Sequence, residues 1–190
     1  MDKVSEMMEY RLKEYAEVFT ENFVYDIVKL IDDIWNTYKQ GGKILICGNG
    51  GSAADSLHFV AELVGRFRVL RRPISSIALN SDVATITAIA NDFDYKNIFA
   101  RQIEALAKKG DILIVISTSG KSSNVLEAIH MANKIGINTT ALLGCDGGEA
   151  AEYINHGIII PNFDTAIVQE IHQMIIHIVC DIIEKKVKNE

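Results

Sequence analysis

Short runs of aliphatic residues alternate with segments of helical periodicity throughout the chain after Gly41. Each run is apolar at consecutive positions, which indicates a strand buried on both faces, and such strands are typical of parallel sheets covered by helices on both sides. We therefore expect an open three-layer α/β/α sandwich with five parallel strands. The expected strands cover residues 43–47, 74–79, 111–117, 138–143 and 157–160, and the expected helices cover residues 52–67, 82–90, 95–108, 122–135 and 165–186.

The first 40 residues contain neither glycine nor proline, and their apolar residues recur at helical spacing. This pattern predicts an amphipathic helix or a pair of helices, the second of which would begin near Thr20 to Asn22. The apolar stripe runs from Val4 to Tyr38 and is long for a helix that serves only its own domain, so we expect a second subunit to cover it. The alternative is a monomer in which this region folds onto its own sheet.

Composition narrows the classes of function. The chain has 190 residues, of which 48% are hydrophobic, and this suits one domain with one buried core. Its 19 basic and 25 acidic residues give a net charge of −6, which provides no broad positive field for a nucleic acid. No apolar run approaches the ~18 residues of a membrane span, and the start lacks an apolar signal segment. Three cysteines without a close pair favour a reducing compartment, so we expect a cytoplasmic protein that binds neither nucleic acid nor a membrane.

Two turns that follow expected strands are rich in glycine or in hydroxyl groups. Ligands of open α/β sheets bind beyond the carboxyl ends of the strands, so these turns are the first candidates for a binding site. The turn at 48–54 reads Gly-Asn-Gly-Gly-Ser-Ala-Ala and is as consistent with a ligand-free tight turn as with a binding loop. The turn at 117–124 places five hydroxyl groups at a helix start, which favours an anion such as a sugar phosphate. Neither turn matches a nucleoside-triphosphate or dinucleotide motif.

Two expected helices each carry polar residues suited to metal binding or proton transfer. His58 and Glu62 are four residues apart and share one helix face, and Gln169 and His177 lie eight apart on the last helix. Taken alone, the first pair is more simply explained as a surface pair, and His177 as a core histidine. Because His177 stands among four aliphatic residues, we expect it to be buried and to face a polar group. Imidazole, carboxylate and amide oxygen together suit zinc or another divalent ion, and a Glu beside a His suits proton transfer.

Together, the loops and the polar pairs resemble the SIS family of phosphosugar isomerases, and within it the branch that acts on seven-carbon sugar phosphates. The resemblance covers nearly the whole chain. It includes Asp55 and the segments at 48–52, 58–66, 91–93, 117–120, 146–148 and 169–172. It implies a flavodoxin-like fold in which residues 1–190 form a single SIS domain, with an N-terminal helical oligomerisation region at 1–40 and an α/β core at 41–190, and it implies a homotetramer.

The resemblance also implies roles for individual residues. It makes Glu62 and His177 the acid–base pair, and it assigns one zinc ion per subunit to His58, Glu62, Gln169 and His177. Arg66, one helical turn beyond Glu62, is a candidate to support a carboxylate or a substrate hydroxyl, although a solvated arginine is an equal alternative. The expected substrate-binding residues are Asn49, Gly50, Gly51, Ser52, Arg66, Asn91, Asp92, Ser117, Thr118, Ser119, Ser122 and Gln169.

The implied activity is an aldose–ketose isomerisation of sedoheptulose 7-phosphate to D-glycero-D-manno-heptose 7-phosphate, in the synthesis of heptose precursors of lipopolysaccharide. Such a reaction moves a proton between C1 and C2 through an enediolate, so it needs a base, an acid and stabilisation of the developing negative charge. The alternative is a non-catalytic SIS module that binds a phosphosugar or the replication initiator, although that branch of the family lacks residues equivalent to Glu62 and His177. Ile167 stands where many members have an arginine, which puts any contact made by that arginine in doubt.

Overall fold

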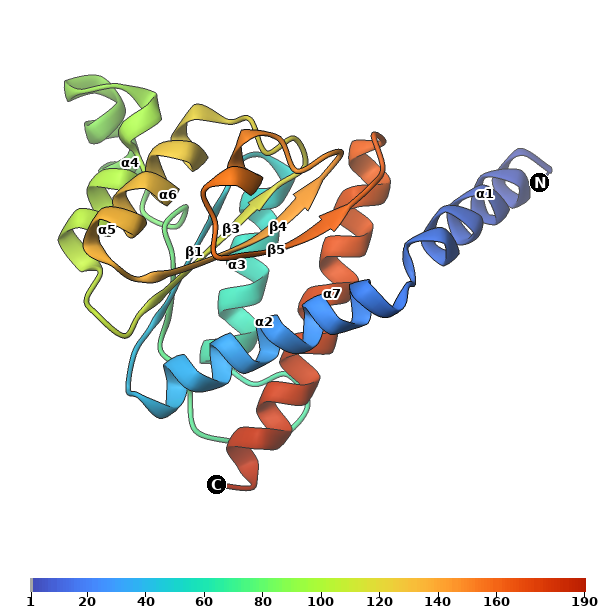
Figure 1. Ribbon diagram of the computed structural model, residues 1–190, viewed down its shortest axis with the longest axis horizontal. Coiled ribbons are helices and arrows are strands. Elements are labelled where there is room, and N and C mark those ends of the chain that lie inside the picture. The colour runs from blue at the N-terminus through green and yellow to red at the C-terminus, as the bar shows by residue number, and fades with distance from the viewer. Residues whose placement is uncertain (1) are drawn as a thin grey trace.

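Five buried strands align in parallel at the centre of the molecule, in the order β2-β1-β3-β4-β5 (Figure 1). The computed structural model describes residues 2–190. The strands are β1 (Ile44–Gly48), β2 (Ser76–Ala78), β3 (Ile112–Ser117), β4 (Asn138–Gly144) and β5 (His156–Ile160). The chain builds outward from β1 toward one edge and from β3 toward the other. This reversal opens a crevice at the carboxyl ends of β1 and β3, where ligands of flavodoxin-like sheets bind.

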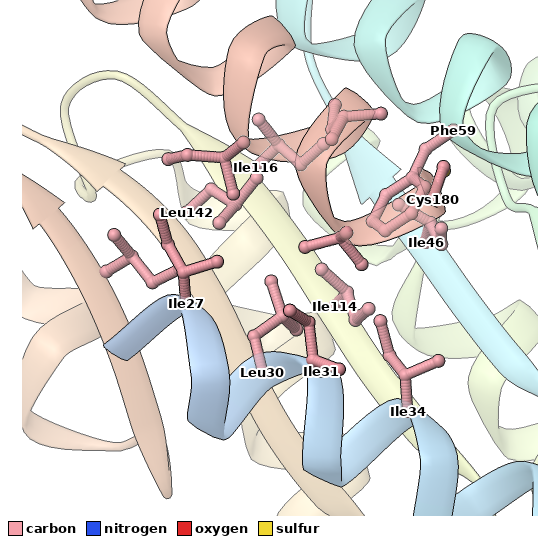
Figure 2. Close-up of a cluster of buried hydrophobic side chains, with 14 of the residues drawn as sticks. Ile27, Leu30, Ile31, Ile34, Ile46, Phe59, Ile114, Ile116, Leu142 and Cys180 are labelled. Atoms are coloured by element: carbon pink, nitrogen blue, oxygen red, sulfur yellow. The ribbon is translucent and has the colours of Figure 1, made fainter. Parts of the chain in front are cut away.

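Each face of the sheet carries its own apolar layer, because side chains alternate along a strand. In β1, Ile44 and Ile46 belong to one layer, whereas Leu45 and Cys47 belong to the other. Figure 2 shows part of the first layer, where isoleucines of α2 meet strand side chains and residues of α3 and α7. The helices of the first layer are α2 (Glu21–Lys39), α3 (Gly51–Val64) and α7 (Thr165–Lys188), those of the second are α4 (Val83–Asp92), α5 (Ala100–Leu106) and α6 (Ser123–Ile135), and α1 (Asp2–Val18) precedes them all. The predicted α/β/α sandwich is confirmed.

The N-terminal helical region is a pair of helices. The Thr20 side chain caps α2 by accepting a hydrogen bond from the Phe23 amide at 3.2 Å, at the place where a restart is predicted. Helix α2 buries its apolar face on its own sheet, so this part of the stripe needs no partner. Helix α1 instead extends away from the sandwich in Figure 1, and Val4, Met8 and Leu12 are 65%, 60% and 64% exposed.

Element boundaries differ most from the prediction at three places. Strand β2 is three residues long rather than six. The helix predicted at 95–108 is divided into a 3-10 turn, η1 (Tyr95–Asn97), and α5, because the Asp94 side chain accepts from the Lys96 amide at 2.9 Å and favours a local turn. Helix α3 ends at Val64 instead of 67, since the backbone leaves the helical region at Gly65 (φ −77°, ψ −119°). A further 3-10 turn, η2 (Glu149–Glu152), precedes β5.

Within residues 2–190, α7 is the one helix with the length and mean hydropathy that crossing a membrane would require. Half of its most apolar window is buried here, and the helix packs against α2, α3 and the sheet. Polar residues interrupt its apolar sequence at helical spacing, which is the pattern of a core helix with one face toward a neighbouring helix.

Candidate functional site

The turns after β1 and β3 meet at the crevice between the two strands. Asn49, directly after β1, and Asn124, in the first turn of α6, exchange two side-chain hydrogen bonds of 2.8 and 2.9 Å. The Tyr95 hydroxyl approaches from η1 and donates to the Asn49 side-chain oxygen at 3.3 Å. The structure thus brings the two predicted binding turns into direct contact. Neither Asn124 nor Tyr95 is among the predicted site residues.

The glycine turn brings its backbone close to α7. Gly50 has φ +55°, a conformation that side chains disfavour, and it begins α3 without any side-chain cap, so the first amides of the helix are available to a ligand. A Cβ atom on Gly51 would lie 2.7 Å from the Cδ atom of Gln169, so this glycine is needed for the close approach of that side chain. Ser52 is buried, and its carbonyl accepts from the Ser56 hydroxyl at 2.8 Å. Gln169 therefore lies over the glycine turn.

The serine turn is held by its own hydroxyl groups. The Ser117 hydroxyl accepts from the Gly120 amide at 3.1 Å, and the Ser119 hydroxyl accepts from the Lys121 amide at 3.2 Å. Ser122 occupies the cap position of α6, yet its side chain makes no capping hydrogen bond. The amides at this helix start are therefore uncapped by a side chain, and the positive end of the helix dipole points into the same region. Such an arrangement favours a bound phosphate.

A row of polar side chains joins α3 to α7 beyond the glycine turn. His58 Nε2 lies 3.1 Å from Glu62 Oε1, and His58 Nδ1 lies 2.9 Å from the side-chain oxygen of Gln173. Gln173 also donates to Asp55, whose pKa is raised by burial, an effect that this hydrogen bond and the nearby His58 oppose. Gln173 and Asp55 are not among the predicted site residues. The spacing of four between Gln169 and Gln173, repeated to His177, is the signal that identifies Gln173.

The prediction that His177 is buried is wrong. The residue is exposed, and its ring packs edge-to-face on His58 with centroids 5.1 Å apart and stacks on Phe67 at 5.5 Å. Ile175 and His177 point to opposite sides of α7, because two residues turn a helix by about 200°. The buried histidine of α7 is instead His172, which lies 3.4 Å from the Leu143 carbonyl oxygen and whose pKa is lowered by burial to about 4.

The four predicted zinc ligands do not form a metal site in this structure. Among residues 2–190, no three His, Cys, Asp or Glu side chains converge in a way that could hold an ion. Both ring nitrogens of His58 are within hydrogen-bond distance of Glu62 or Gln173, and Gln169 is directed to Gly51. The donor types suit a divalent ion, but the side chains as placed do not fit one.

Other predicted residues lie apart from this polar row. Arg66 is exposed and lies after the end of α3, although the prediction places it within the helix. The last carbonyl groups of α3 accept hydrogen bonds from Arg71 instead, including that of Leu63 at 2.8 Å. Asn91 and Asp92 are exposed at the end of α4 and bond to one another at 2.8 Å. Ile167 is fully buried in the core, so its position offers no polar group to the site.

Known proteins match both the sequence and the fold. A family model described as SIS domain matches residues 10–144. The phosphoheptose isomerase of Clostridium acetobutylicum is 49% identical over 88% of this chain and 86% of its own length, and that of Helicobacter pylori strain Shi470 is 45% identical over 94% and 93%. Solved structures of phosphoheptose isomerases from Neisseria gonorrhoeae and Francisella tularensis superpose with TM-scores of 0.90 and 0.92. They are 35% and 36% identical and cover 97% of this chain, and 98% and 97% of their own chains.

Proposed function

The chain belongs to the SIS-domain family, and on that basis we propose that it is a phosphoheptose isomerase, which interconverts sedoheptulose 7-phosphate and D-glycero-D-manno-heptose 7-phosphate. The observation that carries this proposal is the side-chain row on α3 and α7. Glu62 and His58 lie on α3, the helix that begins in the glycine turn, and this row places them beside residues of α7. A carboxylate beside imidazoles, in a fold that also offers an anion-binding turn, is what isomerisation of a sugar phosphate needs.

The phosphate end of the substrate binds at the serine turn in this proposal. The uncapped amides at the start of α6 and the hydroxyl groups of Ser119 and Ser122 are the donors. Asn49 and the neighbouring amides of the glycine turn hold the sugar hydroxyl groups between the two turns. Binding energy gained at the phosphate then fixes the reacting carbons against Glu62.

Glu62 acts as the base in the chemical step. It removes a proton from C1 of the ketose, the electron pair forms the C1–C2 double bond, and His177 gives a proton to the C2 oxygen. The Glu62 carboxyl group then gives a proton to C2, and transfer of the C1 hydroxyl proton to His177 completes the aldose. The contact of His58 Nε2 with Glu62 Oε1 at 3.1 Å orients the carboxylate. We assign to Arg66, Asn91, Asp92 and Gln169 supporting contacts to the substrate.

The resemblance further predicts one zinc ion per subunit. Because the side chains as placed do not fit an ion, the steps above use only residues of the chain. Elemental analysis of the purified protein tests the prediction of zinc: about one zinc per chain, lost on substitution His58→Ala, is the expected result. Full activity of metal-free protein after treatment with a chelator would contradict it.

We also propose a homotetramer in which α1 packs against other subunits and each active site lies at a subunit boundary. Two features support this assembly: the apolar residues of α1 are exposed, and Arg11 and Tyr15 of α1 both bond to Glu170, the neighbour of Gln169. A subunit that covers α1 would therefore lie beside the active site. Residues 1–40 would be the oligomerisation region of a single SIS domain that spans residues 1–190. The proposal also includes a cytoplasmic location and a role in making heptose precursors of lipopolysaccharide.

A coupled assay of the purified protein with sedoheptulose 7-phosphate tests the activity. We expect turnover in the wild-type protein and loss of turnover in Glu62→Gln. Light scattering under the same conditions should give a particle of four chains of 21.0 kDa. No turnover with zinc supplied, together with binding to the replication initiator, would overturn the proposal in favour of the non-catalytic module.

A further inference from the structure

Glu184 is a buried carboxylate that has no part in the mechanism above. It lies on α7, is 1% exposed, and accepts hydrogen bonds from three consecutive backbone amides. These are the amides of Phe67 at 3.3 Å, Arg68 at 2.9 Å and Val69 at 3.2 Å. Successive backbone amides that converge in this way form an anion-binding nest, and here the anion is supplied by the protein itself. The carboxylate thus fixes the segment after α3 against α7.

This fixed segment carries the ring that contacts His177. Phe67 stacks on the imidazole of His177 with centroids 5.5 Å apart and an angle of 23° between the rings. Glu184 lies seven residues after His177, which places the two on nearly the same side of α7, and α7 runs beside α3 in Figure 1. The Glu184 carboxylate therefore binds the backbone of this segment, and the His177 imidazole contacts the Phe67 side chain of the same segment.

The contacts of the His177 ring in this structure are with two other rings. Within residues 2–190, no hydrogen bond to its ring nitrogens is found, and its ring contacts those of His58 and Phe67. An exposed imidazole without a polar partner can adopt other rotamers unless its neighbours prevent this. Phe67 stacks on one face of the ring, and its backbone amide and the next two donate to Glu184.

We propose that Glu184 is a positioning residue for the isomerase reaction, which holds Phe67 against His177 through the three backbone amides and so fixes the imidazole for proton transfer. The inference rests on the proposed function in its use of His177. It predicts that loss of Glu184 acts on the chemical step rather than on substrate binding, because Glu184 lies near the C-terminal end of α7, whereas the phosphate-binding serine turn lies at the carboxyl end of β3.

Steady-state kinetics of four variants test this role. Glu184→Gln and Phe67→Leu should each lower kcat by about tenfold to a hundredfold, with KM changed by less than about twofold. The double variant should be no slower than the slower single variant, since both changes remove the same contact. Asp111→Asn is the matched control: Asp111 is also buried and accepts from the backbone amides of Lys43 and Lys108, but it directly precedes β3 and makes no contact with the Phe67 segment. It should lower the melting temperature and leave kcat unchanged.

A crystal structure of Glu184→Gln separates this inference from the proposed function. The expected result is that the Phe67 ring no longer stacks on His177. A ring that stays stacked in this variant, a kcat equal to that of wild type, or effects of the two substitutions that multiply would overturn the inference. If Glu184→Gln does not fold, Phe67→Leu decides by itself: reduced kcat at an unchanged melting temperature supports the inference, and unchanged kcat overturns it. Full kcat in His177→Asn would instead refute the role proposed for His177.

Discussion

Substitution of Gly120 by alanine tests how tightly the serine turn is packed. Gly120 has φ +61°, and a Cβ atom there would lie 2.6 Å from the Gly147 carbonyl carbon and closer still to its oxygen. Gly136, after α6, has a similar backbone (φ +81°) with no atom within 4 Å of an added Cβ. Both substitutions therefore introduce the same backbone strain, about 1–2 kcal/mol, but only Gly120→Ala adds steric overlap, which costs about 1–3 kcal/mol more.

The difference between the two variants isolates the overlap. We expect urea unfolding at one protein concentration to give a free energy of unfolding lower by about 1–2 kcal/mol for Gly136→Ala and by about 2–5 kcal/mol for Gly120→Ala. Relief of the overlap requires the turn to move, so Gly120→Ala should also raise KM for the sugar phosphate while Gly136→Ala does not. Equal destabilisation by the two substitutions would show that the contact between Gly120 and Gly147 is not as close as described, and would refute the reasoning.

Three further predictions concern the site, the core and the assembly. Replacement of Ser119 and Ser122 by alanine should mainly raise KM, whereas Glu62→Gln should mainly lower kcat; steady-state kinetics that give the reverse pattern would contradict the assignment. His172 has a pKa lowered by burial to about 4 from 6.5, so the unfolded state binds more protons between these values and stability falls as pH decreases through them. The free energy of unfolding in urea should fall by about 2 kcal/mol between pH 6.5 and 5 through His172, and the fall should be smaller by about that amount in His172→Gln. Leu12→Asp on the exposed face of α1 should reduce the particle mass in light scattering and reduce activity; a full-size particle would argue against α1 as the interface.

The sheet and most helices are predictable because their signals are local. A run such as Ile112 to Ile116 is apolar at every position, is short and follows Gly110, all of which is typical of a strand buried on both faces. The break at Thr20 is predictable for the same reason, since a cap acts on amides three residues away. Helix ends are harder to predict from the sequence. Helix α3 ends at Val64 partly because Arg71, several residues further on, donates hydrogen bonds to its carbonyl groups.

The site is predictable only in part, because its contacts join segments far apart in the chain. The burial of His177 was inferred from its aliphatic neighbours in sequence, but on a helix these neighbours face other directions. Gln173 could have been identified by its spacing of four from Gln169. The contact of Glu184 with backbone amides more than 110 residues earlier has no sequence signal, since a nest depends on loop conformation and not on side chains.

Proton NMR of the reaction in deuterium oxide tests the central claim most directly, namely that Glu62 moves a proton between C1 and C2 of a heptose phosphate. With sedoheptulose 7-phosphate as substrate, the wild-type protein should form the aldose with deuterium at C2, because a proton held on a carboxylate exchanges with solvent. Glu62→Gln should form neither the aldose nor deuterated substrate at a measurable rate. Turnover by Glu62→Gln at the wild-type rate, or an aldose that keeps only protium at C2 after many turnovers, would contradict the account.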